Sequence, residues 1–316
     1  MKKVFVSGMA YVALSRVRSI AGLQITDYKQ GSIYCDEELQ GAISDMKHFK
    51  FVSNPFTNVG DRSENEVSKL NIVHHNTEGL VAHFKSLKST CLVKADIICL
   101  TETWLSENVP SSQVQLESFN MFRKDRPGRR VCEDGSSATS NAPHGGVAVY
   151  VRDVYRCSEI PIPDDIGLEC VVTQVSAEGM DHIIVAIYRA PNVLKDLFIS
   201  SLEKLLQHLT AVERNNTVIL GDFNENLLSS EDNKKIQSCL MRNGYEQLIE
   251  APTTMKGTLI DHVYMSALSH VVNHGVIQTF YSYHDAVYCV LCCAQVPEQS
   301  EDEGSTLVVV KEYNVV

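Results

Sequence analysis

Thr217–Asn224, with the sequence TVILGDFN, is the stretch that decides the fold. Four residues that favour a buried strand run directly into Gly221 and Asp222, so a carboxylate stands at the strand end. Because side chains alternate in extended backbone, we expect Asp222 and Asn224 to project from the same side. Gly221 is expected to let the backbone approach whatever those two groups hold. An Asp and an Asn after a strand are also common turn formers, so the stretch needs support from elsewhere in the chain.

Other strand-like segments end in polar groups as well. We expect strands at 70–76, 97–100, 145–152, 168–175, 182–192, 257–266, 271–279 and 282–293. Helices with an apolar face are expected at 79–90 and 193–212, and a polar helix at 232–242. The strands carry these polar side chains to their ends: Asn76, Glu102, Tyr188, Asp222, Asn224, Asp261 and His284. We therefore expect these groups to share one site.

Length and composition indicate a globular protein. The chain has 316 residues, 44% of them hydrophobic, which is enough for a large core. Its net charge of −11 argues against an overall electrostatic attraction to nucleic acid, although a local basic patch or a bound divalent cation is compatible with it. The ten cysteines are scattered, and Cys289 and Cys292 form a C-x-x-C without a second pair, which favours reduced, packed cysteines in an intracellular protein.

Three regions follow from the change in polarity along the chain. Residues 1–67 form an N-terminal extension in which partial disorder is expected, residues 68–296 the main domain, and residues 297–316 an acidic tail. The first 26 residues contain cations and no acidic residue, like a weak transit segment, but their apolar run is too short to cross a bilayer. We expect a monomer in the nucleus or cytoplasm, without membrane contact.

One cationic run stands out in this acidic chain. The sequence RKDRPGRR occupies 123–130 and contains Arg123, Lys124, Arg126, Arg129 and Arg130. A solvated loop is the ordinary interpretation of such a run. It is also the best candidate for contact with a phosphate backbone.

The polar groups at the strand ends suit metal-assisted hydrolysis of a phosphate ester. Asn76 and Glu102 offer oxygen ligands for Mg²⁺, with Mn²⁺ as an alternative. Asp222 could accept a proton from the attacking water. Asn224, Tyr188 and protonated His284 could donate hydrogen bonds to the phosphate oxygens. The carboxylate of Asp261 could orient His284.

The chain from Leu70 to about Cys293 resembles the endonuclease/exonuclease/phosphatase superfamily, and most of all the apurinic-type endonuclease domain of non-LTR retrotransposons. The matching pieces are NTEGL at 76–80, TETWL at 101–105, GGVAVYVR at 145–152, IYRAPN at 187–192, GDFN at 221–224 and IDHVY at 260–264. The resemblance implies an α/β (α+β) fold: a four-layer αββα sandwich of two mostly antiparallel sheets flanked by helices. It also implies the same site roles and a DNA partner.

One position departs from the family pattern. The family closes its site with Ser-Asp-His, whereas this chain has Ser282-Tyr283-His284. The missing carboxylate would lie beside the metal, and Asp285 should point to the opposite face in extended backbone. We therefore expect weaker magnesium binding and reduced turnover.

Three functions remain open at this point. The first is a magnesium-dependent DNA endonuclease of retrotransposon type. The second is a catalytically inactive relative that binds nucleic acid or a protein, which Tyr283 and the acidic charge favour. The third is a phosphoesterase acting on a phospholipid or phosphoinositide, since one fold can host several chemistries.

Overall fold

The computed structural model describes residues 55–56, 68–126, 144–210, 216–230, 234–266 and 268–293. Nearly all of the expected N-terminal extension and the whole acidic tail lie outside these ranges, so the domain boundaries stay predictions. Within the described ranges, no helix is both long and apolar enough to cross a membrane.

The described strands form two six-stranded sheets. The first has the order β11-β12-β1-β2-β4-β3 and consists of β1 (Lys69–Asn76), β2 (Ile97–Thr101), β3 (Phe119–Lys124), β4 (Val147–Arg152), β11 (Val271–Ile277) and β12 (Ala286–Cys292). The second has the order β5-β6-β7-β8-β10-β9 and consists of β5 (Arg156–Glu159), β6 (Glu169–Ala177), β7 (Met180–Tyr188), β8 (Thr217–Asp222), β9 (Glu246–Gln247) and β10 (Asp261–Met265).

Each sheet has one parallel pair at its centre, and the other pairs are antiparallel. The parallel pairs are β1 with β2 and β7 with β8. A parallel pair needs a crossover connection, and α3 (Leu80–Lys88) and α4 (Lys195–Thr210) supply the two crossovers. The remaining α-helix of the described residues is α5 (Lys235–Arg242). Short 3₁₀ turns lie at Cys91–Lys94, Ser111–Val114, Asp164–Ile166 and Leu268–His270.

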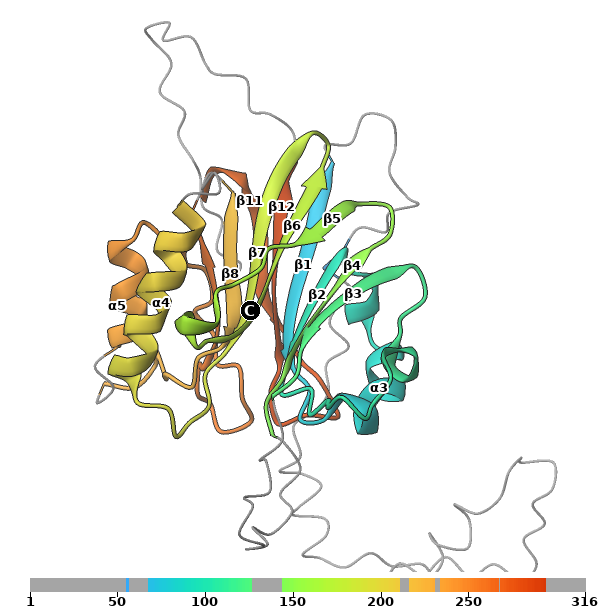
Figure 1. Cartoon of the computed structure of the whole chain (residues 1–316), viewed down its shortest axis with the longest axis horizontal. Helices are drawn as coiled ribbons and strands as arrows, with labels where there is room; N and C mark the ends of the chain where they lie inside the picture. The colour runs from blue at the N-terminus through green and yellow to red at the C-terminus, as the bar shows by residue number, and fades with distance from the viewer. Residues whose placement is uncertain are drawn as a thin grey trace, which may run out of the picture. The chain divides into compact units, whose positions relative to one another are not determined.

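Three apolar interfaces separate four layers. The central one contains inward side chains of both sheets, such as Ile72 of β1 and Leu220 of β8. A second joins α4 and α5 to the outer face of β6, β7 and β8, and a third joins α3 to the outer face of the other sheet. Figure 1 shows α4 and α5 on one side of the paired sheets and α3 on the other. The expected αββα sandwich of mostly antiparallel sheets is confirmed.

Sequence periodicity located the long elements and missed the short ones. The apolar stripe Phe198, Leu202, Leu205 and Leu209 of α4 is buried as expected. The strands β3, β5 and β9 were not expected, since they lie at or near sheet edges and have little apolar alternation. Because β3 extends to Lys124, the basic run begins within a sheet and only its later residues can form a loop.

Candidate active site

Strand ends from both sheets bring three polar side chains together. Asn76 is the last residue of β1 and Asp222 the last of β8, and Asn76 Nδ2 donates to Asp222 Oδ2 at 2.9 Å. His284 lies just before β12, with its Nε2 3.4 Å from Asn76 Nδ2, too long to compete with the bond to Asp222. A hydrogen bond thus joins Asn76 and Asp222, which lie 146 positions apart in the chain, and His284, 208 positions from Asn76, lies beside them.

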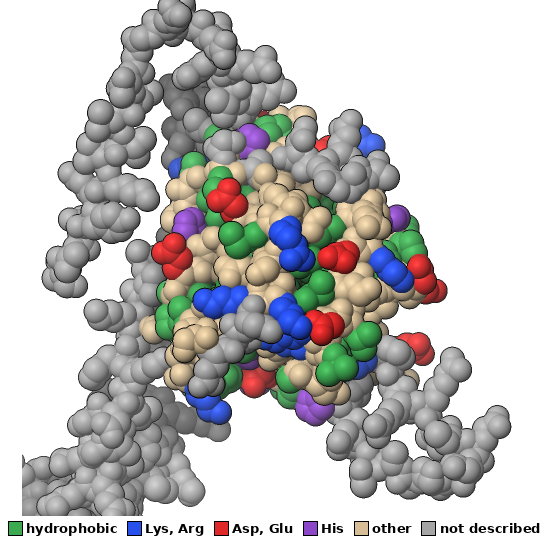
Figure 2. Space-filling view, turned by 90° about the vertical axis from the view of Figure 1, so that its left-hand side faces the viewer, with side chains coloured by type: hydrophobic (Ala, Val, Ile, Leu, Met, Phe, Trp, Pro, Cys, Tyr) green, Lys and Arg blue, Asp and Glu red, His purple; other side chains and the backbone are tan. Residues whose placement is uncertain are grey.

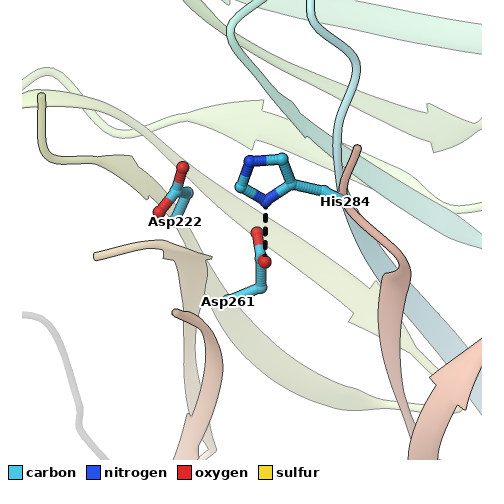
Figure 3. Close-up of side chains that lie close together, drawn as sticks. All are labelled: Asp222, Asp261 and His284. Carbon is cyan, nitrogen blue, oxygen red and sulfur yellow. Dashed lines mark hydrogen bonds and ion pairs between the residues drawn. The ribbon is translucent and has the colours of Figure 1, made fainter. Parts of the chain in front are cut away.

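Asp261 fixes the imidazole of His284. His284 Nδ1 lies 2.9 Å from Asp261 Oδ2, and Thr253 Oγ1 donates to the same oxygen at 2.7 Å. Figure 3 shows Asp222 and Asp261 on different sides of the His284 ring. Burial alone would lower the pKa of His284, but the Asp261 carboxylate outweighs it and raises the pKa to about 10. Burial works against ionisation of Asp261 too, yet His284 lowers its pKa, so the pair is an imidazolium and a carboxylate at neutral pH.

The pKa of Asp222 is shifted in the opposite direction to that of Asp261. It is 1% exposed, and burial, followed by the negative charge of Asp261, raises its pKa to about 7. The charge of His284 and the donors Asn224 N and Asn76 Nδ2 hold the value down. A carboxyl group with a pKa near 7 can accept a proton and release it at physiological pH.

Glu102 and Tyr188 form the neighbouring half of the site. The Tyr188 hydroxyl donates to Glu102 Oε1 at 2.8 Å, and Trp104 Nε1 donates to Glu102 Oε2 at 3.2 Å. Burial and the nearby carboxylate of Glu102 raise the pKa of Tyr188, so the phenol stays protonated. Tyr188 is the strand partner of Asp222 across β7 and β8, which connects this half to Asp222 and Asn76.

The turn after Asp222 differs from the expected extended backbone. The strand ends at Asp222, and Asn224 has a φ of 48°, which is left-handed and ends the alternation of side chains. The Asn224 amide therefore donates to Arg189 O at 2.8 Å. Arg189 in turn donates to the carbonyls of Phe223 and Asn224, both at 2.6 Å, and braces the turn.

Gly221 serves the sheet and not a ligand. A Cβ added there would lie 1.8 Å from the carbonyl oxygen of Ile187 in β7. The expectation that this glycine admits a ligand is therefore wrong, because the close neighbour is the backbone of the adjacent strand.

The described part of the basic run is held by contacts within the protein. Arg123 pairs with Asp125 at 2.8 Å, and Lys124 Nζ donates to Leu168 O at 3.2 Å. Arg126 binds the Glu169 carboxylate through Nε and Nη2, and its guanidinium lies 5.5 Å from the Tyr188 ring centroid. Arg126 is thus beside the candidate site, whereas Arg129 and Arg130 lie outside the described residues. The face formed by α4 and α5 carries cations and acids interspersed (Figure 2), with Lys235 and Asp196 2.7 Å apart.

Glu78 holds the segment that contains Ser282 and Tyr283. Its Oε2 accepts from Tyr283 N at 2.6 Å and from Ser282 Oγ at 3.0 Å. Asp285 accepts from Thr279 N through Oδ1 at 3.1 Å. The NTEGL motif contains Glu78, but its partners lie about 200 residues away, so the pattern alone gave no sign of this role.

His74 is a further residue that sequence reasoning passed over. It is fully buried, its Nε2 lies 3.0 Å from Thr101 Oγ1, and its Nδ1 lies 3.9 Å from Asp261 Oδ1. Both Nδ1 and Asp261 Oδ1 lack a hydrogen-bond partner. Burial lowers the pKa of His74 to about 4, so a neutral imidazole faces the carboxylate.

The site offers a divalent cation two groups of donors. Asp222, Asp261 and His284 place ligand atoms within 4.8 Å of one another. His284 is protonated at neutral pH, so a cation bound through His284 has to displace a proton. Glu102 is half-buried and supplies carboxylate oxygens, and Asn76 supplies an amide oxygen, which is the chemistry that Mg²⁺ prefers.

A family model places the chain among known proteins. The model described as endonuclease/exonuclease/phosphatase family matches residues 73–284, more than half of the chain. The chain belongs to this family. Members of the family are typically hydrolytic nucleases or phosphatases, and they generally use divalent metals. A search of curated proteins gave no match.

Solved structures of the family are similar in fold. The endonuclease domain of TRAS1, a telomere-specific non-LTR retrotransposon, has a TM-score of 0.53 at 12% identity and covers 71% of this chain and 98% of its own. The catalytic domain of human Nocturnin, with a bound sulfate anion, has a TM-score of 0.51 at 14% identity, and the match covers 70% of this chain and 92% of the Nocturnin domain. The 3′-5′ exonuclease NExo from Neisseria meningitidis has a TM-score of 0.50 at 17% identity, and the match covers 70% of this chain and 98% of NExo. At such identities the likeness shows the fold alone.

Proposed function

We propose that the protein is a magnesium-dependent phosphodiesterase that cleaves DNA, an endonuclease derived from a retrotransposon domain. One observation carries the proposal: strand ends from both sheets place Asn76, Asp222 and His284 in contact, with Asp261 against His284. A carboxyl group that titrates near 7 can accept a proton from water, and a protonated donor beside it can stabilise charge on a phosphoryl oxygen. The similarity in fold to the TRAS1 endonuclease domain supports DNA as the substrate.

Each residue has a role in this reaction. Asp222 orients the attacking water and accepts its proton, and Asn76 holds the Asp222 carboxyl in place. Imidazolium His284 donates to a non-bridging oxygen as charge develops on phosphorus, with Asp261 keeping it protonated. The Tyr188 hydroxyl, which lies against Glu102, donates a hydrogen bond to a phosphate oxygen on that side of the site.

Asn224 and the metal ligands complete the proposal. Asn224 reaches the phosphate if its amide leaves Arg189 O, and otherwise acts by shaping the turn after Asp222. Magnesium, or manganese, would be held by Glu102 and Asn76, where it would supply Lewis-acid stabilisation of charge on phosphate oxygens. The cationic residues proposed to contact the DNA backbone are Arg123, Lys124, Arg126, Arg129 and Arg130.

Nicking of supercoiled plasmid DNA tests the proposal. The wild-type chain should convert supercoiled to open-circular plasmid with Mg²⁺, and EDTA should stop the conversion. Asp222→Ala should lower the rate by about 10² or more, the usual contribution of a general base. Asp165→Asn is the matched control, since its side chain is 77% exposed on the Asp164–Ile166 turn and lies 4.0 Å from Lys204 Nζ of α4. Equal rates for Asp222→Ala and wild type would exclude Asp222 as the base.

A second candidate function is a catalytically inactive relative that binds nucleic acid or a protein. The observation that favours it is Tyr283, which stands where the family pattern has a carboxylate. Glu78 lies against this segment, but its carboxylate already accepts from Ser282 and Tyr283. Nicking by Tyr283→Asp with none by the folded wild type would favour this candidate. Nicking by the wild type would exclude it.

A further inference from the structure

The phenol ring of Tyr283 lies beside the 253–258 turn. Thr254 forms an isolated antiparallel bridge with His284, and Met255 N donates to Tyr283 O at 3.2 Å. The Tyr283 ring is partly exposed, and Lys256 Nζ lies 5.7 Å from its centroid. Because Tyr283 N also donates to Glu78 Oε2 at 2.6 Å, both backbone polar groups of Tyr283 are bonded and the backbone that carries the ring is fixed.

The ring also lies next to the candidate active site. Its centroid is 5.5 Å from that of the His284 imidazole, and the two planes meet at 81°. His284 is itself 6% exposed, so Tyr283 is the more accessible of the two rings. A group that binds the phosphate at His284 would therefore bring its neighbouring atoms to the Tyr283 ring.

The chemistry of this surface suits a nucleotide. An accessible aromatic ring offers a stacking platform that tolerates any base, and a lysine at its side offers a cation for a phosphate. Lys256 and Met255 are both exposed on the turn, so the surface combines an ammonium, a thioether and a phenol. The nearby Glu78 carboxylate accepts from two donors, which reduces its repulsion of a phosphate.

We propose that Tyr283 and Lys256 form a nucleotide subsite, in which the ring stacks on the base next to the scissile phosphate and Lys256 contacts the adjoining phosphate. This inference rests on the proposed function, because it requires a nucleic acid in the neighbouring site. It gives Tyr283 a binding role at the position where the family pattern has a carboxylate.

Binding measurements in EDTA test the subsite without requiring cleavage. Fluorescence anisotropy would give the Kd of labelled single-stranded DNA oligonucleotides, either intact or with one abasic nucleotide moved along the strand. Tyr283→Phe keeps the ring and should bind like wild type, whereas Tyr283→Leu should bind about tenfold more weakly, the usual effect of losing one stacked base. Phe280→Leu is the matched control, since Phe280 is an exposed aromatic residue, at 56%, on the preceding loop.

Position dependence and salt dependence identify the two contacts. In wild type, base removal at one position should weaken binding about tenfold, and Tyr283→Leu should abolish that difference. Lys256→Gln should lower the slope of log K against log salt by about 0.7, the value for one phosphate of a single strand. Thermal unfolding of each variant would verify folding.

The outcomes separate the two proposals. Equal affinity of Tyr283→Leu and wild type for every oligonucleotide would overturn the subsite, and so would an equal loss in Tyr283→Phe and Tyr283→Leu. Wild-type binding to neither single-stranded nor duplex DNA would overturn the proposed function and the subsite with it. Nicking that depends on Asp222, together with unchanged binding in Tyr283→Leu, would leave the function intact and refute the subsite alone.

Discussion

Replacing Asp261 by asparagine removes the charge that keeps His284 protonated and preserves the shape of the side chain. The pKa of His284 is raised from 6.5 to about 10 against the effect of burial. At 1.36 kcal/mol per pKa unit, the shift corresponds to about 5 kcal/mol in favour of the imidazolium. Without the Asp261 carboxylate, burial should lower the pKa of His284 markedly, since only the weaker effects of Asp222 and Glu78 still raise it.

An NMR titration of the His284 ring measures this directly, with His284→Gln to assign the signal. The wild-type ring should stay protonated to about pH 9, and the Asp261→Asn ring should be neutral at pH 8. Asp285→Asn is the matched control, because it removes the same charge one residue from His284 but on a side chain bonded to Thr279 N. The same titration curve for His284 in wild type and Asp261→Asn would refute the electrostatic account.

The pair also predicts how stability depends on pH. The folded-state pKa of His284 lies above its ordinary value, so its contribution to stability is complete below pH 6.5 and is lost as the pH rises toward 10. The pKa of Asp261 is lowered, so its contribution is complete above its ordinary value of 3.8 and is lost as the pH falls. Urea unfolding of the wild type should therefore show a decline between pH 7 and 10 that is smaller in Asp261→Asn.

Three further predictions concern single substitutions. Asp222→Asn should raise the free energy of unfolding by about 2–4 kcal/mol at pH 8. The folded-state pKa of Asp222 is raised from 3.8 to about 7, so its ionisation costs stability from about pH 4 upward. Urea unfolding at pH 5 and pH 8 would show whether the gain in stability grows with pH. Gly221→Ala should destabilise by about 3 kcal/mol or more in the same assay, because its Cβ would meet the Ile187 carbonyl, and an unchanged midpoint would contradict the close approach of β7 and β8. Tyr188→Phe should lower kcat by about 10² with little change in melting temperature, as measured by nicking kinetics and calorimetry, and an unaltered kcat would remove the hydroxyl from the reaction.

The sequence predicted the long strands and their ends for a local physical reason. A buried strand is a short apolar run, and the polar residue that ends it is the next letter, as Asn76 and Asp222 show. Edge strands such as β3 and β9 were not predicted, because a strand exposed on one side needs no apolar run.

The contacts of the site were harder to predict because they join distant parts of the chain. The left-handed turn at Asn224 depends on Arg189 bonding the carbonyls of Phe223 and Asn224, which no local pattern encodes. Glu78 received no role, since its partners Ser282 and Tyr283 lie at the other end of the domain. The same holds for the basic run, whose Arg126 is bound to Glu169.

The central claim is that Glu102 from one sheet and Asp222 from the other belong to one catalytic unit. Plasmid-nicking rates of Glu102→Gln, Asp222→Asn and the double variant test it most directly. Groups that act together give non-additive losses, so the double variant should be about as slow as the slower single variant. A double variant whose loss equals the product of the two single losses, or single variants that nick at the wild-type rate, would contradict the claim.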